Sequence, residues 1–245
     1  MKSKIALITG GTGGIGTAIC SKLHKQGAHV IATYNRGGDH KAAESWREEQ
    51  GYDITLMYVD VANFDCCSRM VQQVKEKFGK IDILVNNAGI TRDVQLRKME
   101  PEQWRTVLQT NLDSIFNITR NVINGMIENN YGRIINISSI NGQKGQFGQA
   151  NYAAAKAGIH GFTKTLAQEV ARKGITVNSI SPGYIATKMV MTMPEEIRQQ
   201  IVAQIPVGRL GKPEEIANVV AFLAAEENSF ITGANIAING GQYLS

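Results

Sequence analysis

The chain has 245 residues, 43% of them hydrophobic, which is typical of one globular α/β domain. Its 26 basic and 21 acidic residues give a net charge of +5, and their scatter argues against nucleic-acid binding and suits a small anionic ligand. No apolar run reaches the length of a membrane span, and the first apolar strand begins too early to leave room for a signal peptide, so we expect a soluble cytoplasmic protein. Cys20, Cys66 and Cys67 lack metal-ligand spacing, which predicts inert thiols and no metal site.

Short apolar runs alternate with helical stretches along the whole chain. This alternation predicts a single α/β domain over residues 1–245, a doubly wound parallel sheet of about seven strands with helices on both faces. We expect the strands at residues 4–9, 28–33, 55–60, 81–86, 132–138, 176–181 and 235–238. Right-handed crossovers bring the carboxyl ends of parallel strands to one rim. The residues that end strands, Thr9, Asp60, Asn86, Ser138 and Ser181, should therefore line one crevice.

The first strand runs directly into the glycine-rich turn Gly10-Gly-Thr-Gly-Gly-Ile-Gly16. A helix is expected over residues 17–26 and a second strand after it, which is the context of a dinucleotide fingerprint. Glycines let the backbone approach a pyrophosphate, and the helix N-terminus supplies unpaired N–H donors. The turn predicts cofactor contacts at Gly10, Thr12, Gly13, Gly14, Ile15 and Gly16. A tight loop without a ligand is the alternative.

Tyr152 and Lys156 are four residues apart, and Ser139 lies thirteen residues before the tyrosine. On a helix, positions i and i+4 share a face. An ammonium about 4 Å from a phenol favours the phenolate by about 4 kcal/mol at an effective dielectric constant near 20, or about three pKa units. Such a tyrosine can donate a proton near neutral pH, which predicts acid catalysis on an oxygen with Ser139 as a second donor. A surface Tyr and Lys on an amphipathic helix is the alternative.

Several motifs together resemble the short-chain dehydrogenase/reductases from residue 4 to about residue 241. They are Thr9-Gly-x-x-x-Gly14-Ile-Gly16, Asn86-Asn-Ala-Gly89, Asn111, Ser139, Tyr152-x-x-x-Lys156 and Pro182-Gly183, in the order and spacing of that family. The resemblance implies a Rossmann fold and an oxidoreductase that uses a nicotinamide cofactor. Residues 87–93 and 138–149 look most like the 3-oxoacyl thioester reductases, above all those that reduce acetoacetyl-CoA to the (R)-3-hydroxyacyl thioester for polyhydroxybutyrate synthesis. Reductases of acyl carrier protein thioesters are similar throughout and remain the alternative, although they usually carry more basic residues before the position of Arg133.

The resemblance also implies the remaining cofactor contacts. They are Asp60 and Val61 at the adenine, Asn86, Ala88, Gly89 and Ile90 beside the adenosine ribose, Tyr152 and Lys156 at the nicotinamide ribose, and Pro182, Gly183, Ile185 and Thr187 at the nicotinamide. After the second strand no carboxylate occurs until Asp39, whereas Arg36 offers a guanidinium to a 2′-phosphate. We therefore predict NADPH over NADH. A solvated Arg36 with Asp39 turned to the ribose is the alternative.

By the same resemblance, Asn111 anchors a water that connects Lys156 with solvent, inside one long helix over residues 100–126. The alternative is a mid-helix asparagine that bonds its own backbone. Ser138 competes with Ser139, but the family spacing selects Ser139. The expected substrate contacts are Asp93, Ser139, Gln146, Phe147, Gln149, Gly183 and Tyr184. Residues 184–211, with a short helix at 194–204, are expected to form a lid over the substrate. The helices at 100–126 and 151–173 are expected to form subunit contacts of a homotetramer.

Overall fold

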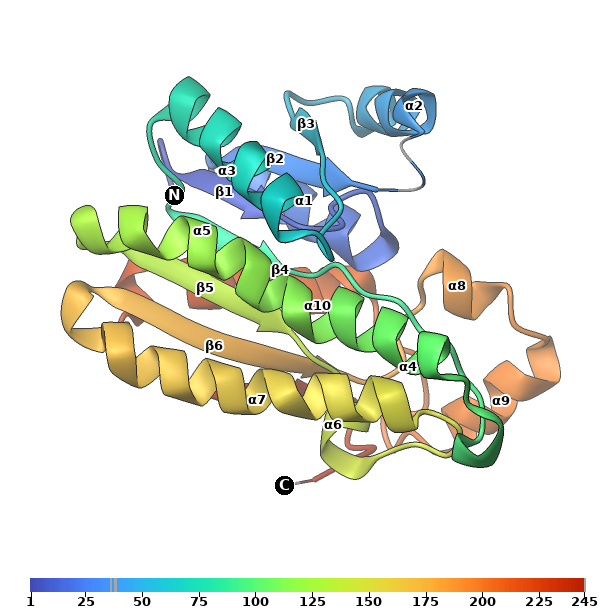
Figure 1. Ribbon diagram of the computed structural model, residues 1–245. Helices are drawn as coiled ribbons and strands as arrows, with labels where there is room; N and C mark the ends of the chain where they lie inside the picture. The colour runs from blue at the N-terminus through green and yellow to red at the C-terminus, as the bar shows by residue number, and fades with distance from the viewer. Residues whose placement is uncertain (36, 38, 245) are drawn as a thin grey trace.

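The computed structural model describes residues 1–35, 37 and 39–244. Within these residues seven parallel strands form one sheet in the order β3-β2-β1-β4-β5-β6-β7 (Figure 1). The strands are β1 (Ile5–Ile8), β2 (His29–Tyr34), β3 (Thr55–Tyr58), β4 (Ile83–Asn86), β5 (Gly132–Ile137), β6 (Ile175–Pro182) and β7 (Asn235–Ile238). The predicted doubly wound parallel sheet is confirmed, and each strand falls on a predicted run.

Helices cover both faces of the sheet. In chain order they are α1 (Gly14–Lys25), α2 (His40–Gln50), α3 (Phe64–Phe78), α4 (Pro101–Leu108), α5 (Ser114–Glu128), α6 (Asn141–Lys144), α7 (Ala150–Val170), α8 (Lys188–Met191), α9 (Glu195–Ala203) and α10 (Pro213–Ala224). Core residues of α1 and α10 pack on one face, and those of α3, α5 and α7 on the other. Strands β1, β4, β5 and β6 are buried along their whole length, which explains their continuous apolar sequence.

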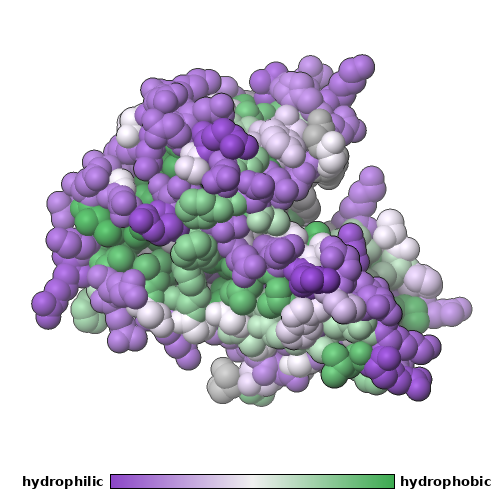
Figure 2. Space-filling model, viewed as in Figure 1, coloured by the Kyte–Doolittle hydropathy of each residue, from purple (hydrophilic) through white to green (hydrophobic). Residues whose placement is uncertain are grey.

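The strand order reverses direction between β1 and β4, which lie side by side at the centre of the sheet. A crevice is expected outside the carboxyl ends of the strands at such a switch point. Figure 2 shows a hollow at this edge, between the part of the molecule that carries α2 and the part that carries α8. The predicted rim of strand ends therefore faces an open crevice.

Helix α1 begins at Gly14, three residues before the predicted start at residue 17. Glycine has a low helix propensity, so the sequence favoured a later start. Packing overrides that preference, because a Cβ at Gly16 would lie 2.3 Å from the carbonyl oxygen of Gly10. The glycines therefore let the first turn of the helix lie directly against the end of β1.

The long helix predicted at residues 100–126 is interrupted. α4 and α5 are joined by a π-helical turn at Gln109–Asp113, and the chain continues helically to Glu128. A turn of this kind holds one residue more than an α-helical turn and frequently occurs at functional sites. Asn111, which the sequence singled out, lies in this turn and is 1% exposed.

The predicted lid segment leaves the body of the protein after β6 and returns before α10. It carries α8 and α9, close to the predicted helix at 194–204, and both stand away from the sheet in Figure 1. Its two ends are tied together, because Gly211 N–H donates to the Tyr184 carbonyl (2.9 Å) and Ala186 N–H donates to the Gly211 carbonyl (2.8 Å).

Among the described residues, no helix is both long and apolar enough to cross a membrane.

Candidate active site

The glycine-rich turn is shaped by close backbone contacts that exclude side chains. Gly10 has a φ of +61°, a conformation that glycine adopts without strain. A Cβ at Gly11 would lie 2.6 Å from the Cβ of Ala32 in β2, and the one at Gly16 would clash as described above. The resulting bare backbone at the start of α1 fits the pyrophosphate of a dinucleotide, because N–H groups and the positive end of the helix dipole meet there. Thr12 is buried within this turn, and Ile15 packs against the core.

Two residues fasten this turn to β4. The Thr9 hydroxyl accepts the backbone N–H groups of Asn87 (3.0 Å) and Ala88 (3.1 Å). The Asn87 amide donates to the carbonyl groups of Thr9 (3.0 Å) and Gly10 (3.1 Å). We did not single out Asn87 from the sequence, although an asparagine directly after a predicted strand and before Gly89 is a detectable signal. The two sides of the crevice are thus joined at its floor.

The residues expected at the adenosine differ in where they point. The Asp60 carboxylate accepts the Ala62 N–H (3.1 Å) at the end of β3, and the Val61 carbonyl accepts from Asn117 (3.0 Å). The Asn86 side chain donates to Thr119 (3.2 Å) and Asn136 (2.8 Å) in a buried network. The Asn86 side-chain amide therefore forms hydrogen bonds inside the core, and only the Asn86 backbone remains a predicted cofactor contact.

The sequence around the end of β2 governs the expected choice of cofactor. Arg36, the predicted partner of a 2′-phosphate, lies outside the described residues. Asp39, its possible competitor, accepts the Ala42 N–H (3.0 Å) and caps α2. The carboxylate is therefore engaged in holding the helix, which disfavours the alternative in which it turns to a ribose.

Ser139, Tyr152 and Lys156 lie together at the carboxyl end of β5. The Ser139 hydroxyl lies near enough to the Tyr152 phenol to lower its pKa. Tyr152 and Lys156 share one face of α7, with the Lys156 Nζ 5.7 Å from the centre of the tyrosine ring. The competing Ser138 is turned away, because its hydroxyl donates to the Lys156 carbonyl (2.8 Å). The geometry therefore favours Ser139 over Ser138.

The predicted effect of Lys156 on the tyrosine is wrong for this structure. Burial raises the pKa of Tyr152 above its usual value, and the Ser139 hydroxyl only partly opposes this; the Asp93 carboxylate raises the pKa further. The Lys156 ammonium donates instead to the Ile137 carbonyl (2.8 Å). The sequence argument placed the ammonium about 4 Å from the phenol, and it took no account of burial, which disfavours the phenolate.

Asn111 is fixed by the chain that follows β4. Its Oδ1 accepts the Ile90 N–H (2.7 Å) and its Nδ2 donates to the Ile90 carbonyl (2.8 Å). It therefore does not bond its own helix backbone, which was the alternative. A Cβ at Gly89 would lie 3.1 Å from the Asn111 Oδ1 and 3.5 Å from the Lys156 Nζ, so glycine there lets both polar groups approach one point. Its role in holding a water remains a prediction.

The expected substrate residues form two groups. Asp93 and Gln149 are joined by a 2.7 Å hydrogen bond close to Tyr152. Gln146 and Phe147 are exposed, with Phe147 80% exposed, and extend from the loop before α7. Asp93 also raises the pKa of Tyr184, after the larger effect of burial. The Asp93 charge thus acts on two tyrosines, one from α7 and one from the start of the lid segment.

The remaining contacts expected at the nicotinamide surround the start of the lid. A Cβ at Gly183 would lie 2.9 Å from the Cα of Asn239, so β6 and the chain after β7 are in close contact. A Cβ at Gly14 would lie 3.0 Å from the Thr187 Cγ2, which places Thr187 at the N-terminus of α1. Pro182 and Ile185 are buried. The lid segment therefore begins directly beside the glycine-rich turn.

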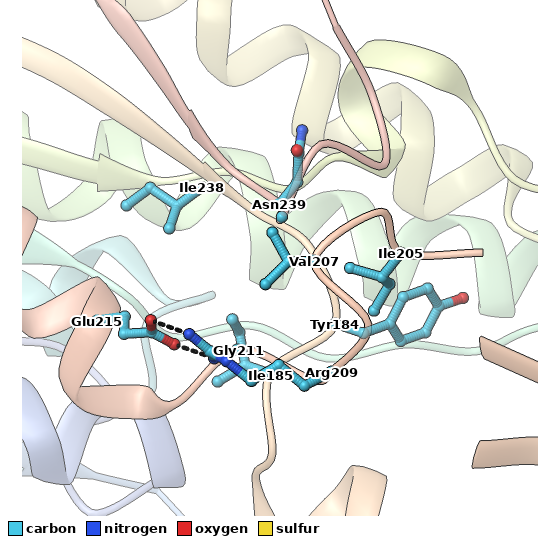
Figure 3. Close-up of a pocket in the computed structure, with 10 residues that line it drawn as sticks. Tyr184, Ile185, Ile205, Val207, Arg209, Gly211, Glu215, Ile238 and Asn239 are labelled. Atoms are coloured by element: carbon cyan, nitrogen blue, oxygen red, sulfur yellow. Dashed lines mark hydrogen bonds and ion pairs between the residues drawn. The ribbon is translucent and has the colours of Figure 1, made fainter. Parts of the chain in front are cut away.

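A cavity of about 110 Å³ lies at the base of the lid segment, lined in part by Tyr184, Ile205 and Val207 (Figure 3). Its lining does not include Ser139, Tyr152 or Lys156. Arg209 holds Glu215 at its edge through two 2.8 Å hydrogen bonds, which lower the pKa of Glu215 to about 2. This ion pair ties the returning end of the lid segment to the first turn of α10.

The burial of Lys156 predicts a pH-dependent stability. Burial lowers its pKa from 10.5 to about 8. Between these values the unfolded chain binds a proton that the folded chain does not, so the contribution of this group to the free energy of unfolding rises with pH, by up to about 1.4 kcal/mol per pH unit. We expect urea unfolding at pH 8 and pH 10 to show this gain in the wild type relative to Lys156→Met. Equal pH dependence in both proteins would contradict the buried ammonium.

The chain is similar to known proteins over nearly its whole length. The family model described as enoyl-(acyl carrier protein) reductase matches residues 10–242. The chain is 53% identical to an acetoacetyl-CoA reductase of Allochromatium vinosum over 99% of each chain, and 53% identical to one of Cupriavidus necator over 100% of each. It is 45% identical to a 3-oxoacyl-[acyl-carrier-protein] reductase of Haemophilus influenzae over 100% of each. The chain therefore belongs to the short-chain dehydrogenase/reductase family, a family of oxidoreductases.

Proposed function

We propose that this protein reduces acetoacetyl-CoA to (R)-3-hydroxybutanoyl-CoA with NADPH, in the cytoplasm and for polyhydroxybutyrate synthesis. The observation that carries the proposal is the 53% identity, over essentially the whole chain, to relatives named acetoacetyl-CoA reductase. The grouping of Ser139, Tyr152 and Lys156 at the crevice supports it, because this set of donors suits reduction of a carbonyl.

Reduction of a ketone requires a hydride at carbon and a proton at oxygen, and bound NADPH would supply the hydride. Negative charge develops on the substrate oxygen, and the Ser139 and Tyr152 hydroxyls are the two donors that would stabilise it. Tyr152 gives its proton to that oxygen. The raised pKa of Tyr152 keeps the phenol protonated at neutral pH, as a general acid requires. Lys156 and Asn111 would restore the proton through water, and Lys156 would also hold the nicotinamide ribose.

Other residues would hold the cofactor in place. The N–H groups at the start of α1 would bind the pyrophosphate, and Thr187 would contact the nicotinamide end, since it lies against Gly14. NADPH is favoured over NADH because Asp39 is engaged at the cap of α2 and Arg36 is the basic residue nearest the end of β2 in sequence. We expect kcat/KM for NADPH to exceed that for NADH by at least about tenfold, or about 1.4 kcal/mol. Similar values for the two cofactors would contradict this preference.

The coenzyme A thioester is distinguished from the carrier protein thioester by a direct comparison. The alternative deserves a test because a relative named as a carrier protein reductase is 45% identical over the whole chain. NADPH oxidation is followed at equal concentrations of acetoacetyl-CoA and acetoacetyl-acyl carrier protein. We expect kcat/KM to be at least about tenfold higher for the coenzyme A thioester, or about 1.4 kcal/mol. A preference for the carrier protein would replace the proposed substrate by its alternative.

We also propose that the protein is a homotetramer. Large apolar side chains on α4 and α5 face outward, with Trp104 40% and Phe116 52% exposed, and the outward residues Ala154, Ala157 and Gly161 on α7 are small enough for close helix contact. An exposed apolar surface of this kind is often a subunit interface. Light scattering that gives the mass of one 26.7 kDa chain would contradict the proposal.

A further inference from the structure

Three segments meet beside the reacting hydroxyls through a chain of side-chain hydrogen bonds. The Asn141 Nδ2, at the start of α6, donates to the Gln149 Oε1 (2.9 Å). The Gln149 Nε2, directly before α7, donates to the Asp93 Oδ2 (2.7 Å) in the loop after β4. We call Asn141, Gln149 and Asp93 the amide relay. It connects the segment that carries Ser139, the helix that carries Tyr152 and the loop that carries Asp93.

The Asp93 carboxylate determines which groups of the relay donate and which accept. A carboxylate only accepts hydrogen bonds, so Gln149 must turn its NH₂ group towards Asp93. Its carbonyl oxygen then faces Asn141, and Asn141 must donate. The Asn141 side chain is 8% exposed, and its Oδ1 has no hydrogen-bond partner among the described residues. Because a buried acceptor without a partner is unfavourable, this orientation is held by the donor side of the amide.

The relay is joined by one backbone hydrogen bond to the Ser139 hydroxyl and by another to the first turn of α7, the helix that carries Tyr152. The backbone N–H of Asn141 donates to the Ser139 Oγ (3.1 Å), and the Ser139 hydroxyl lies near enough to the Tyr152 phenol to lower its pKa. The backbone carbonyl of Gln149 accepts the Ala153 N–H (2.8 Å) in the first turn of α7. The Asn141–Gln149 bond therefore connects the backbone that holds the Ser139 hydroxyl with the start of the helix that carries Tyr152.

We propose that Asn141 is a positioning residue, whose side-chain amide, held by Gln149 and Asp93, fixes the backbone N–H that orients the Ser139 hydroxyl against Tyr152. Asn141 reaches no reacting atom itself. Its effect on turnover rests on the proposed function, whereas the existence of the relay does not.

The variant Asn141→Asp tests the donor, because it keeps the shape of the side chain and sets a carboxylate oxygen against the Gln149 Oε1. A misplacement of about 1 Å at a reacting group costs about 100-fold in rate. We expect kcat to fall by about 10-fold to 100-fold, with the Kd for NADPH, from fluorescence titration, unchanged within about twofold. The matched control is Asn129→Asp, which makes the same change at an exposed site directly after α5 and should leave kcat unchanged. An unchanged kcat in Asn141→Asp would overturn the proposal, as would an equal loss of NADPH binding.

A second variant reverses the relay. In Asp93→Asn/Asn141→Asp, residue 93 can donate to Gln149, and Gln149 can flip and donate to residue 141. The loss caused by Asn141→Asp should therefore be at least about threefold smaller in the Asp93→Asn background than in the wild type, a non-additivity expected of groups in one network. The same fold-loss in both backgrounds would overturn the relay.

The activity and the relay are judged separately. A wild-type protein that does not turn over acetoacetyl-CoA overturns the proposed function and with it the catalytic effect of Asn141. The relay is then tested by urea unfolding of the wild type, Asn141→Asp, Asp93→Asn and the double variant, which needs no substrate. If the two substitutions change the unfolding midpoint non-additively, the relay is supported, and if their effects on the midpoint add, the relay is overturned.

Discussion

Replacing Tyr152 with phenylalanine should lower kcat for acetoacetyl-CoA reduction by about 10²–10⁴-fold, the range typical of a lost general acid. The variant removes the hydroxyl that lies near Ser139 and leaves the ring in place beside Lys156. Because the phenol is largely buried, the ring still fills its space and the fold should persist. We therefore expect NADPH to bind with a Kd within about twofold of the wild type, in the range of a substitution that leaves binding contacts intact.

Tyr131→Phe provides the matched control. It makes the same chemical change just before β5, at the opposite end of the strand from Ser139. Its kcat should equal that of the wild type, as measured by NADPH oxidation under the same conditions. A Tyr152→Phe protein that keeps near-normal kcat would remove the tyrosine from the mechanism and leave Ser139 as the only hydroxyl donor of the proposed pair.

Replacing Gly16 with alanine should weaken NADPH binding. The new Cβ would lie 2.3 Å from the Gly10 carbonyl oxygen and 2.9 Å from the Gly11 Cα. Both neighbours are backbone atoms, so the clash is relieved only if α1 moves away from the turn that it supports. Overpacking of this kind costs about 1–3 kcal/mol of stability. Displacement of the helix N-terminus by a fraction of an ångström also removes aligned N–H donors, and we expect Kd for NADPH to rise by at least about 10-fold, or about 1.4 kcal/mol.

The control for this change is Gly125→Ala in α5, where the nearest atom to the new Cβ is the flexible Lys75 Cε at 3.6 Å. Alanine is favoured over glycine in a helix interior by about 0.5–1 kcal/mol, so this variant should be at least as stable as the wild type. Fluorescence titration with NADPH and thermal unfolding decide both cases. Normal NADPH affinity in Gly16→Ala would show that the turn does not require its close contact.

The fold could be predicted from the sequence because its signals are local. Residues 81–86 and 132–138 read as continuous apolar runs because their strands are covered on both faces, and the structure places β4 and β5 there. The start of α1 was missed because helix propensity describes a glycine in isolation. The contact between Gly16 and Gly10 that decides the start is a tertiary fact.

The grouping of Ser139, Tyr152 and Lys156 could be predicted from the sequence, whereas the electrostatics of this group could not. The spacing of Tyr152 and Lys156 predicts one helix face, and α7 provides it. The spacing says nothing of depth, and burial is what raises the pKa of Tyr152 and lowers that of Lys156 to about 8. Asn111 was expected inside a regular helix, because a π-helical turn has no clear sequence signal. The amide relay was also invisible, since it joins residues 93, 141 and 149 from three segments.

The π-helical turn at Gln109–Asp113 makes the helix less regular, but it places the Asn111 amide where it can bond Ile90. It adds one residue to what would otherwise be a continuous rod from Pro101 to Glu128. A one-codon deletion there would restore an uninterrupted α-helix with regular backbone bonding, because the π-helical turn holds one residue more than an α-helical turn. The helix would become more regular, but the Asn111 amide would lose its two hydrogen bonds to Ile90. A deletion in this turn can therefore improve the backbone hydrogen bonding of the helix and still impair the protein, because it displaces Asn111.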